Sequence, residues 1–377
     1  MLLFAGLFMG WSLGTNDAAN AFGTAVATRV VKYRTSIIII AIMVILGSIL
    51  QGADDIDKLA SISTNNEVSA SVDDIEGVGV EFEKDADGNY VKDEDGNYVI
   101  KSKDNVDEAA LKTLRIKSGF RAAIIFACAG LTVFIMSYLK FPVSANQAVT
   151  GAIIGWGLFH ANYSDPVVKS TNLTEIIEFV STWLLNPLGA ALISFVIVFF
   201  FKKFFEAKVE SLKSYDKILK IGYIVAGAYS AYTIGINSSA SVTAFYYDSF
   251  GVGANVLTSA RLTAILGGVA IAIGVLTYSK KVMMTVGSSI ANISQIDGFL
   301  VILASALAIT IMKVLLGIPV STSQAVVGAV IGAGLVKGPK NVDWKVLGKI
   351  GIAWISSPTA AGLMAYIVAL CTQSVLS

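Results

Sequence analysis

The chain has 377 residues, of which 55% are apolar and 15% are charged, and its mean hydropathy is +0.70. Soluble globular proteins carry about 25% charged residues, so this composition excludes that class. Long uncharged runs approach the roughly 20 residues that cross a bilayer, which predicts an all-α polytopic membrane protein embedded in lipid. Two cysteines in apolar runs build no disulfide framework, and a single histidine argues against a metal site.

In chain order, the apolar segments predict ten helices. They cover residues 3–28, 35–52, 119–139, 142–160, 173–201, 218–245, 254–278, 298–316, 319–336 and 350–371. One set of connections is basic, as at Arg29, Lys202 and Lys280, and the other set includes the acidic segment 53–118. The positive-inside rule places the basic side in the cytoplasm and both termini outside, in a multi-pass protein of the plasma (inner) membrane. No cleavable signal is expected, because no basic segment precedes the first run.

Residues 53–118 form an acidic, soluble insert with 17 Asp/Glu and 8 Lys/Arg, which leaves 10 acids and 20 bases for the rest of the chain. The insert repeats Asp-Gly-Asn-Tyr-Val at a spacing of eight, a hairpin signal that predicts a small extracellular β-rich unit. Calcium is the alternative, because four acids match positions of an EF-hand loop: Glu83, Asp85, Asp87 and Glu94. Glu at the first position and the lack of helical flanks argue against calcium binding.

Three blocks of sequence occur twice and keep their order along the chain. The matched stretches are 4–22 with 225–243, 140–157 with 317–334, and 183–192 with 354–363. Each half has an odd number of crossings, so the second copy is inserted upside down relative to the first. Inverted repeats with Gly- or Pro-interrupted segments are typical of secondary transporters. Chance similarity of small-residue runs is the alternative.

The repeat predicts a division of the chain into four parts. Residues 1–52 and 119–201 form the first transmembrane repeat, which the insert 53–118 interrupts. Residues 202–217 form a cytoplasmic linker, and residues 218–377 form the second, inverted repeat. The fold class we expect is therefore two inverted-topology repeats with broken or re-entrant helices.

The stretches KFPVSANQAVTGAIIGWG and GIPVSTSQAVVGAVIGAG share Pro-Val-Ser-x-x-Gln at the start of an apolar run. Ser followed three residues later by Gln is a capping box, which predicts a helix N-terminus. Within a membrane such a terminus must be buried in protein or line a cavity, so we expect two re-entrant or broken helices whose N-termini face each other and attract an anion. Ordinary caps are the alternative. The polar residues concerned are Ser144, Asn146, Gln147, Ser321, Thr322, Ser323 and Gln324.

The stretch GTNDAANAF carries Asp17, the only carboxylate of the first apolar segment, with Asn16 before it and Asn20 one turn later. Asp and Asn next to Gly suit an unwound point at which carbonyls and a carboxylate hold a hard cation. A neutral carboxyl in a packed interface is the alternative. The second copy keeps Asn237 but has Ser238 in place of the acid, so only one half brings a negative charge.

GTNDAANAFGTAV resembles the GxNDxxNxxG signature of the inorganic phosphate transporter (PiT) family, and the paired PVSxxQAxxGAxxG segments resemble its other hallmark. The resemblance implies a cation-coupled phosphate symporter with an inverted-repeat fold that is often a homodimer. It places phosphate near Ser144, Asn146, Ser321, Thr322 and Ser323. It places sodium near Asn16, Asp17, Asn20, Gln147, Asn237 and Gln324. Ser238 and Ser241 depart from the family pattern and leave the coupling stoichiometry open.

The function we expect is import of inorganic phosphate by sodium symport with alternating access. Proton coupling, or sulfate as the anion, is the alternative within the same fold. An anion channel or membrane receptor explains the paired caps and Asp17 less well. No nucleophile–base constellation lies in the apolar segments, so an enzyme is not expected, nor are a cofactor or a nucleic-acid partner.

Overall fold

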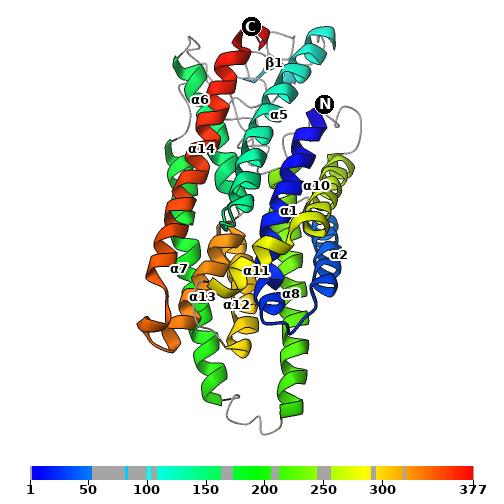
Figure 1. The fold of residues 1–377 in the computed structure, drawn as a ribbon. Helices are drawn as coiled ribbons and strands as arrows, with labels where there is room; N and C mark the ends of the chain where they lie inside the picture. The colour runs from blue at the N-terminus through cyan, green and yellow to red at the C-terminus, as the bar shows by residue number, and fades with distance from the viewer. Residues whose placement is uncertain are drawn as a thin grey trace.

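The computed structural model describes residues 2–52, 81–83, 100–102, 108–162, 173–204, 212–243, 256–289, 294–316 and 320–376. In these ranges the chain is a bundle of helices, with one pair of short strands at an end of the bundle (Figure 1). The predicted helical class is confirmed.

Each of the ten predicted segments contains a helix. The long elements are α1 (Leu2–Ala27), α2 (Tyr33–Gln51), α5 (Glu108–Tyr138), α6 (Ala145–Asn162), α7 (Leu173–Phe204), α8 (Leu212–Thr243), α10 (Val256–Tyr278), α12 (Gln295–Leu316), α13 (Thr322–Val336) and α14 (Trp344–Leu376). Two further elements were not predicted, the helix α11 (Lys280–Ser289) and the 3₁₀ turn η4 (Pro339–Asn341).

Six of the described helices are long and apolar enough to cross a membrane: α2, α5, α7, α10, α12 and α14. On α7, Leu184, Leu188 and Leu192 recur every four residues and are each about two-thirds exposed, at 68%, 67% and 66%. An apolar stripe of this size suits lipid and not water. By contrast, the 15 residues of α13 span about 22 Å, which is less than the bilayer core.

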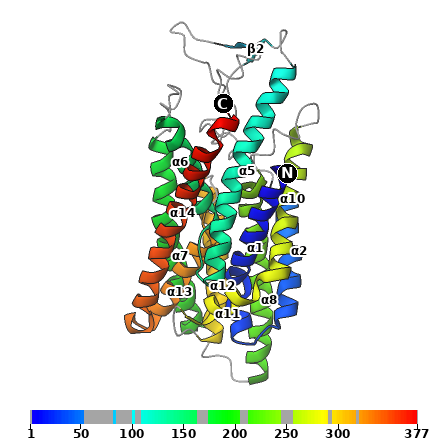
Figure 2. The same cartoon turned by 45° about the horizontal axis from the view of Figure 1, so that its top comes forward.

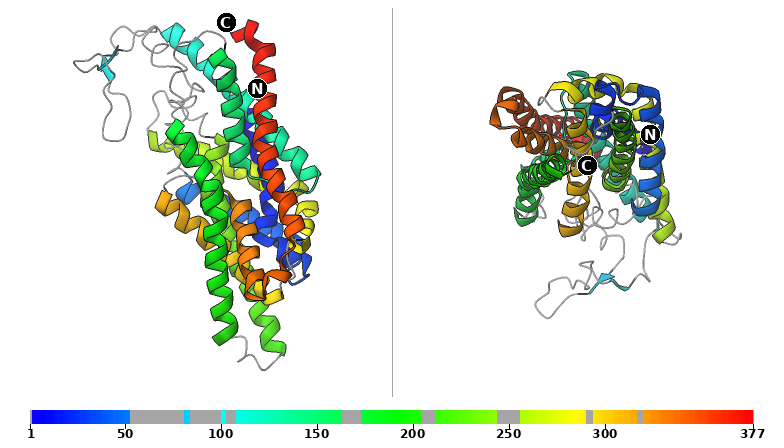
Figure 3. Two further views of the ribbon diagram at one scale, coloured as in Figure 1. Left: turned by 90° about the vertical axis from the view of Figure 1, so that its left-hand side faces the viewer. Right: turned by 90° about the horizontal axis from the view of Figure 1, so that it is seen from below.

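The chain direction alternates so that α1 and α8 run in opposite senses, as do α6 and α13, and both termini lie at the same end of the bundle (Figure 1). The helix contacts also correspond between the two halves of the chain. Helix α7 packs on α13 and α14 packs on α6; α1 packs on α10 and α8 packs on α2; α1 packs on α5 and α8 packs on α12. These three pairs of contacts correspond when the helices of one half are exchanged for those of the other, and α1 and α8 also pack on each other. Figure 3 shows the bundle from the side and along its length.

Part of the acidic insert is described. Strands β1 (Glu81–Phe82) and β2 (Ile100–Ser102) pair antiparallel, with Phe82 opposite Ile100, at the end of the bundle where the termini lie (Figure 2). Helix α5 begins at Glu108, within the predicted insert. Glu83 is exposed, whereas the repeated Asp-Gly turns and the other three acids considered for calcium lie outside the described residues.

The expected unwound point near Asp17 is wrong, because α1 is one continuous helix from Leu2 to Ala27. Gly14, which suggested the break, serves close packing. A Cβ atom there would overlap the carbonyl oxygen of Ile271 on α10, so glycine is needed for helix contact. Gly235 plays the same part on α8, against the carbonyl of Val44 on α2.

Candidate functional site

Two helices, α6 and α13, begin deep inside the bundle. Ser144 and Ser321 are 3% and 6% exposed, and each caps its helix: Gln147 N donates to Ser144 Oγ (3.3 Å) and Gln324 N donates to Ser321 Oγ (3.2 Å). The sequence prediction of two buried helix N-termini is confirmed. The chain folds this way because the serine hydroxyl satisfies an N–H group that no intrahelical carbonyl can reach.

The two N-termini meet through a reciprocal pair of hydrogen bonds. Asn146 Nδ2 donates to Val320 O (3.3 Å), and Ser323 Oγ donates to Val143 O (2.9 Å). Ser323 matches Asn146 in the repeated stretch, and Val320 matches Val143. The same contact is therefore made in both directions, and this holds the first turns of α6 and α13 beside each other.

Asp17 of α1 joins this centre through α13. Thr322 Oγ1 donates to Asp17 Oδ2 (2.8 Å), and Asn20 Nδ2 donates to Asp17 Oδ1 (3.1 Å). The same Asn20 amide lies 3.3 Å from Thr322 Oγ1 and 3.2 Å from Ser323 Oγ. The carboxylate is 3% exposed. A charge of the first half is thus bound to the helix terminus of the second half.

Three asparagine side chains bind the backbone just before the first turns of α6 and α13. The side-chain amide of Asn237 on α8 makes two hydrogen bonds to the backbone of Val320. Its Nδ2 donates to Val320 O (2.7 Å), and its Oδ1 accepts from Val320 N (2.9 Å). Asn16 of α1 donates to Ser137 Oγ (2.9 Å) and to the carbonyl of Phe141 (3.2 Å). Asn186 of α7 donates to Ser321 O (2.7 Å).

Small residues allow the backbone of each short helix to approach a long neighbour. A Cβ at Gly328 would overlap the carbonyl of Pro187 on α7, and a Cβ at Gly151 would overlap the carbonyl of Pro358 on α14. One turn later, Gly332 and Gly155 are equally close to the next stretch of those helices. Two small residues four apart are a general means of close helix contact in membranes. They place the N-termini of α6 and α13 at a fixed depth.

Several polar atoms at this centre have no partner among the described residues. The amide oxygens of Gln147, Gln324 and Asn16 are buried without a hydrogen bond. The capping boxes are therefore only half formed, because a full box would use each Gln side chain on the backbone of its cap residue. The hydrogen bonds of the described chain also leave the first two N–H groups of α6 and of α13 available. Buried polar atoms of this kind are costly unless a ligand completes them.

The centre therefore has groups that suit two kinds of ligand. Free N–H groups and hydroxyls at two helix N-termini suit an oxyanion. A carboxylate and neutral amide oxygens suit a hard cation. The structure brings the residues predicted to bind phosphate and sodium to this centre. The sequence analysis missed Asn186, which lies in the repeated block at 183–192 before Pro187 and is fully buried. A polar residue in a long apolar helix was the signal for it.

A buried polar centre, built from helix termini within a multi-span bundle, defines the class of membrane transport proteins. Comparison with known proteins agrees. The profile of the phosphate transporter family matches residues 13–365, so the chain belongs to that family and is a transporter, not an enzyme.

Relatives match along nearly the whole chain. One relative is a protein of Methanocaldococcus jannaschii that is named as a phosphate permease. It is 27% identical over 97% of this chain and 95% of its own length. The sulfate permease CysP of Bacillus subtilis is 26% identical over 97% of this chain and 86% of its own. A solved structure described as the sodium-dependent phosphate transporter has a TM-score of 0.69 and 20% identity, with 99% of this chain and 98% of that chain covered; it is similar in fold.

Proposed function

We propose that the protein imports inorganic phosphate by sodium symport, through an alternating-access cycle. The observation that carries this proposal is the reciprocal contact of two buried helix N-termini, Asn146 with Val320 and Ser323 with Val143, beside the carboxylate of Asp17. An anion and a cation then share one centre, which is what coupling of their transport requires. The proposal is supported by membership of the phosphate transporter family.

Phosphate would bind between the first turns of α6 and α13. The available N–H groups would donate to its oxygens, and the two helix dipoles would stabilise its charge without a lysine or arginine. The side chains that would add donors are Ser144, Asn146, Ser321, Thr322 and Ser323. Of these, Thr322 contacts Asp17 directly, so it is the link between the anion and the charged group.

Sodium would bind with Asp17 and the unpartnered amide oxygens of Asn16, Gln147 and Gln324 as candidate ligands. Oxygen ligands of this type suit a hard monovalent cation. Asn20 would orient the Asp17 carboxylate, to which it already donates. Asn237 has both amide atoms engaged on Val320 and would hold the α13 approach in place.

Alternating access would follow from the two halves. We infer that they are inverted repeats, because the helix pairs of one half recur in the other and the matched helices run in opposite senses. The centre lies where both halves contribute, so a movement of one against the other would expose it to either side in turn. With the basic connections in the cytoplasm, both termini are outside. A homodimer is part of this proposal by family resemblance alone.

Sulfate transport is the second candidate, and the similarity to the sulfate permease CysP favours it. Phosphate and sulfate are both tetrahedral oxyanions and both suit donors at helix N-termini. Proton coupling is a variant of either, with Asp17 as the proton carrier. The two anions differ because phosphate is partly protonated at neutral pH and can donate a hydrogen bond to a carboxylate such as Asp17.

The test is uptake of radiolabelled phosphate by proteoliposomes that contain the purified protein. Sodium and proton gradients are imposed separately, with sulfate as competitor. Uptake driven by sodium and indifferent to sulfate is the expected result. Uptake driven only by protons would contradict sodium coupling, and sulfate uptake in place of phosphate would contradict the proposed substrate.

A further inference from the structure

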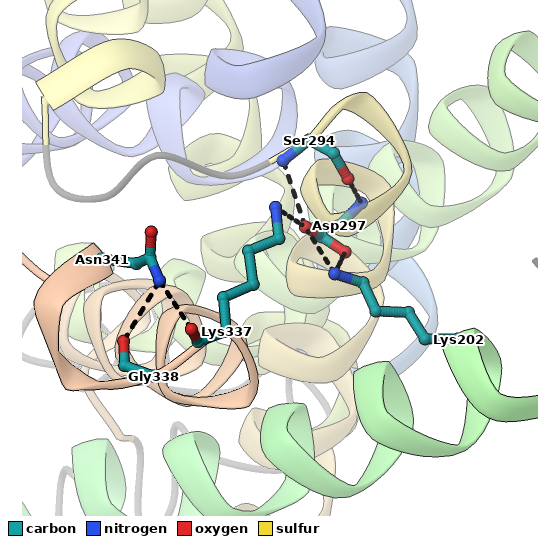
Figure 4. A network of polar contacts seen from close by, with 6 residues as sticks. All are labelled: Lys202, Ser294, Asp297, Lys337, Gly338 and Asn341. Atoms are coloured by element: carbon teal, nitrogen blue, oxygen red, sulfur yellow. Dashed lines mark hydrogen bonds and ion pairs between the residues drawn. The ribbon is translucent and has the colours of Figure 1, made fainter.

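A second buried charge lies away from the proposed binding centre. Asp297 is fully buried, and its carboxylate meets two lysines: Lys337 Nζ lies 2.7 Å from Oδ2, and Lys202 Nζ lies 3.1 Å from Oδ1 (Figure 4). The lysine side chains are 29% and 22% exposed, so they reach inward from the surface. We call these three residues the Asp297 clamp. None of them has a part in the proposed binding of phosphate or sodium.

The clamp joins three helices at the end of the bundle that carries the basic connections. Asp297 is in the first turn of α12, Lys202 is in the last turn of α7, and Lys337 directly follows α13. The carboxylate is also held by its own helix, because Ser294 N donates to Asp297 Oδ2 (3.1 Å) and Asp297 N donates to Ser294 Oγ (3.3 Å). This capping box fixes Asp297 as a stationary anchor for the two lysines.

Helix α13 connects the clamp to the binding centre. Its first residue, Thr322, donates to Asp17, and the residue after its last, Lys337, pairs with Asp297. Helix α7 also connects the two regions, because its Asn186 donates to Ser321 O and its Lys202, near the C-terminal end, pairs with Asp297. A rigid helix transmits a displacement along its axis. The two ends of α13 are thus tied to two buried carboxylates, Asp17 and Asp297.

The residue next to the anchor, Gly298, lies where three helices approach one another closely. A Cβ at Gly298 would overlap the hydroxyl of Tyr223 on α8 and would lie 3.6 Å from Cβ of Thr24 on α1. Tyr223 is fully buried, and Thr24 lies one turn beyond Asn20 towards the basic end. Helices α1, α8 and α12 thus meet at this level, adjacent to the clamp.

The sequence of the other half has no equivalent of the clamp. Ser118-Gly119-Phe120 matches Asp297-Gly298-Phe299, so a serine takes the place of the acid. Continuing the match of 140–157 with 317–334 places His160 at the position of Lys337. Continuing the match of 183–192 with 354–363 places Gln373 at the position of Lys202. None of these three matched positions holds an acid, so the ion pair of Asp297 has no counterpart there.

We propose that Asp297 is a positioning residue for transport, which holds α7 and α13 in the state closed to the basic end and must release Lys202 and Lys337 for that end to open. This role rests on the proposed function, in which α13 carries part of the anion site. In the closed state the clamp keeps Thr322 on Asp17. Release would let α13 move away from α12 and uncover the contact of Thr24, Tyr223 and Gly298.

The first experiment measures closure without any substrate. Thr24→Cys is introduced with Cys128→Ser and Cys371→Ser, and a membrane-impermeant maleimide is added to vesicles on the basic side. Asp297→Asn and, as a milder change, Lys337→Met should raise the labelling rate by about tenfold, because the open state becomes more populated. Asp343→Asn is the matched control, since Asp343 is an exposed acid at the same end of the bundle. An unchanged rate in both clamp variants would overturn the proposal.

The second experiment separates positioning from folding. Per folded molecule, Asp297→Asn should raise the phosphate KM by about 3- to 10-fold, because coupling through a rigid element carries an effect of this size. The exchange Asp297→Lys with Lys337→Asp keeps one acid and two bases and should recover part of the KM. If the KM of Asp297→Asn equals that of the Asp343→Asn control, Asp297 has no positioning role in transport. If no variant transports phosphate, including the parent, the proposed function fails, while the labelling result still decides the clamp.

Discussion

The two halves of the molecule make corresponding helix contacts but carry different charges at the centre. At the matched position of α1 and α8, the first half has Asp17 and the second has Ser238. Asp17 accepts a hydrogen bond from Thr322 of the other half and a second one from Asn20 of its own helix. Ser238 is buried at 2% exposure but brings no charge. The comparison teaches that corresponding helix contacts occur in the two halves, while the chemistry of the centre differs between them.

The largest expected effect separates Asp17 from Ser238. Asp17→Asn should lower coupled uptake by about 100-fold, because a lost charged contact is worth up to about 3 kcal/mol and each 1.4 kcal/mol is tenfold. Ser238→Ala should leave uptake within about twofold, since it removes no charge. Initial uptake rates in proteoliposomes measure both. Sodium-driven uptake at the parent rate in Asp17→Asn would exclude this carboxylate from coupling.

The close approach of α13 to α7 should respond strongly to added volume. Gly328→Ala should lower the free energy of unfolding by about 1–3 kcal/mol, because its Cβ would overlap the Pro187 carbonyl and the helices would have to separate. Gly157→Ala on α6 is the control, since no atom lies within 4 Å of the added Cβ. Thermal unfolding in detergent measures both. Equal unfolding temperatures would show that the helix contact tolerates a methyl group.

Asn186 and Ser357 occupy matched positions in α7 and α14 and are both fully buried. Asn186→Ala should cost about 1–3 kcal/mol, because Ser321 O would lose its donor inside the bundle. Ser357 Oγ has no hydrogen-bond partner among the described residues, so Ser357→Ala should change stability by less than about 0.5 kcal/mol. Chemical denaturation of the two variants tests the difference. A larger loss at Ser357 would reverse the assigned asymmetry.

The caps should behave alike in the two halves. Ser144→Ala with Ser321→Ala removes both capping hydroxyls, each worth about 0.5–2 kcal/mol, and should raise the apparent phosphate KM by about 3- to 10-fold. The single variants should share this effect about equally, because the two helix termini make matched contacts. Concentration dependence of uptake provides the KM values. A KM that stays at the parent value in the double variant would remove both hydroxyls from the anion site.

Periodicity and repeated motifs were sufficient for the helical class, the ten segments and the two buried N-termini. Hydrophobic runs of membrane length leave few alternatives to helices, because a backbone in lipid must satisfy its own hydrogen bonds. The pairing of Ser with Gln predicted the caps at Ser144 and Ser321 because capping is a local interaction. The short helix α11 was not predicted, since residues 280–289 are mixed in polarity and resemble a loop.

What the sequence determined by itself is therefore local and periodic: where helices begin, which residues are polar within them, and that three blocks of sequence recur in the same order. The tertiary structure alone decided that α1 stays continuous past Gly14, because only the neighbouring carbonyl of Ile271 reveals that the glycine serves packing. It also decided that Asp17 binds α13 of the other half and that Asp297 meets Lys202 and Lys337. These partners lie tens to hundreds of residues apart in the chain, and no local pattern specifies which distant helix a side chain will face.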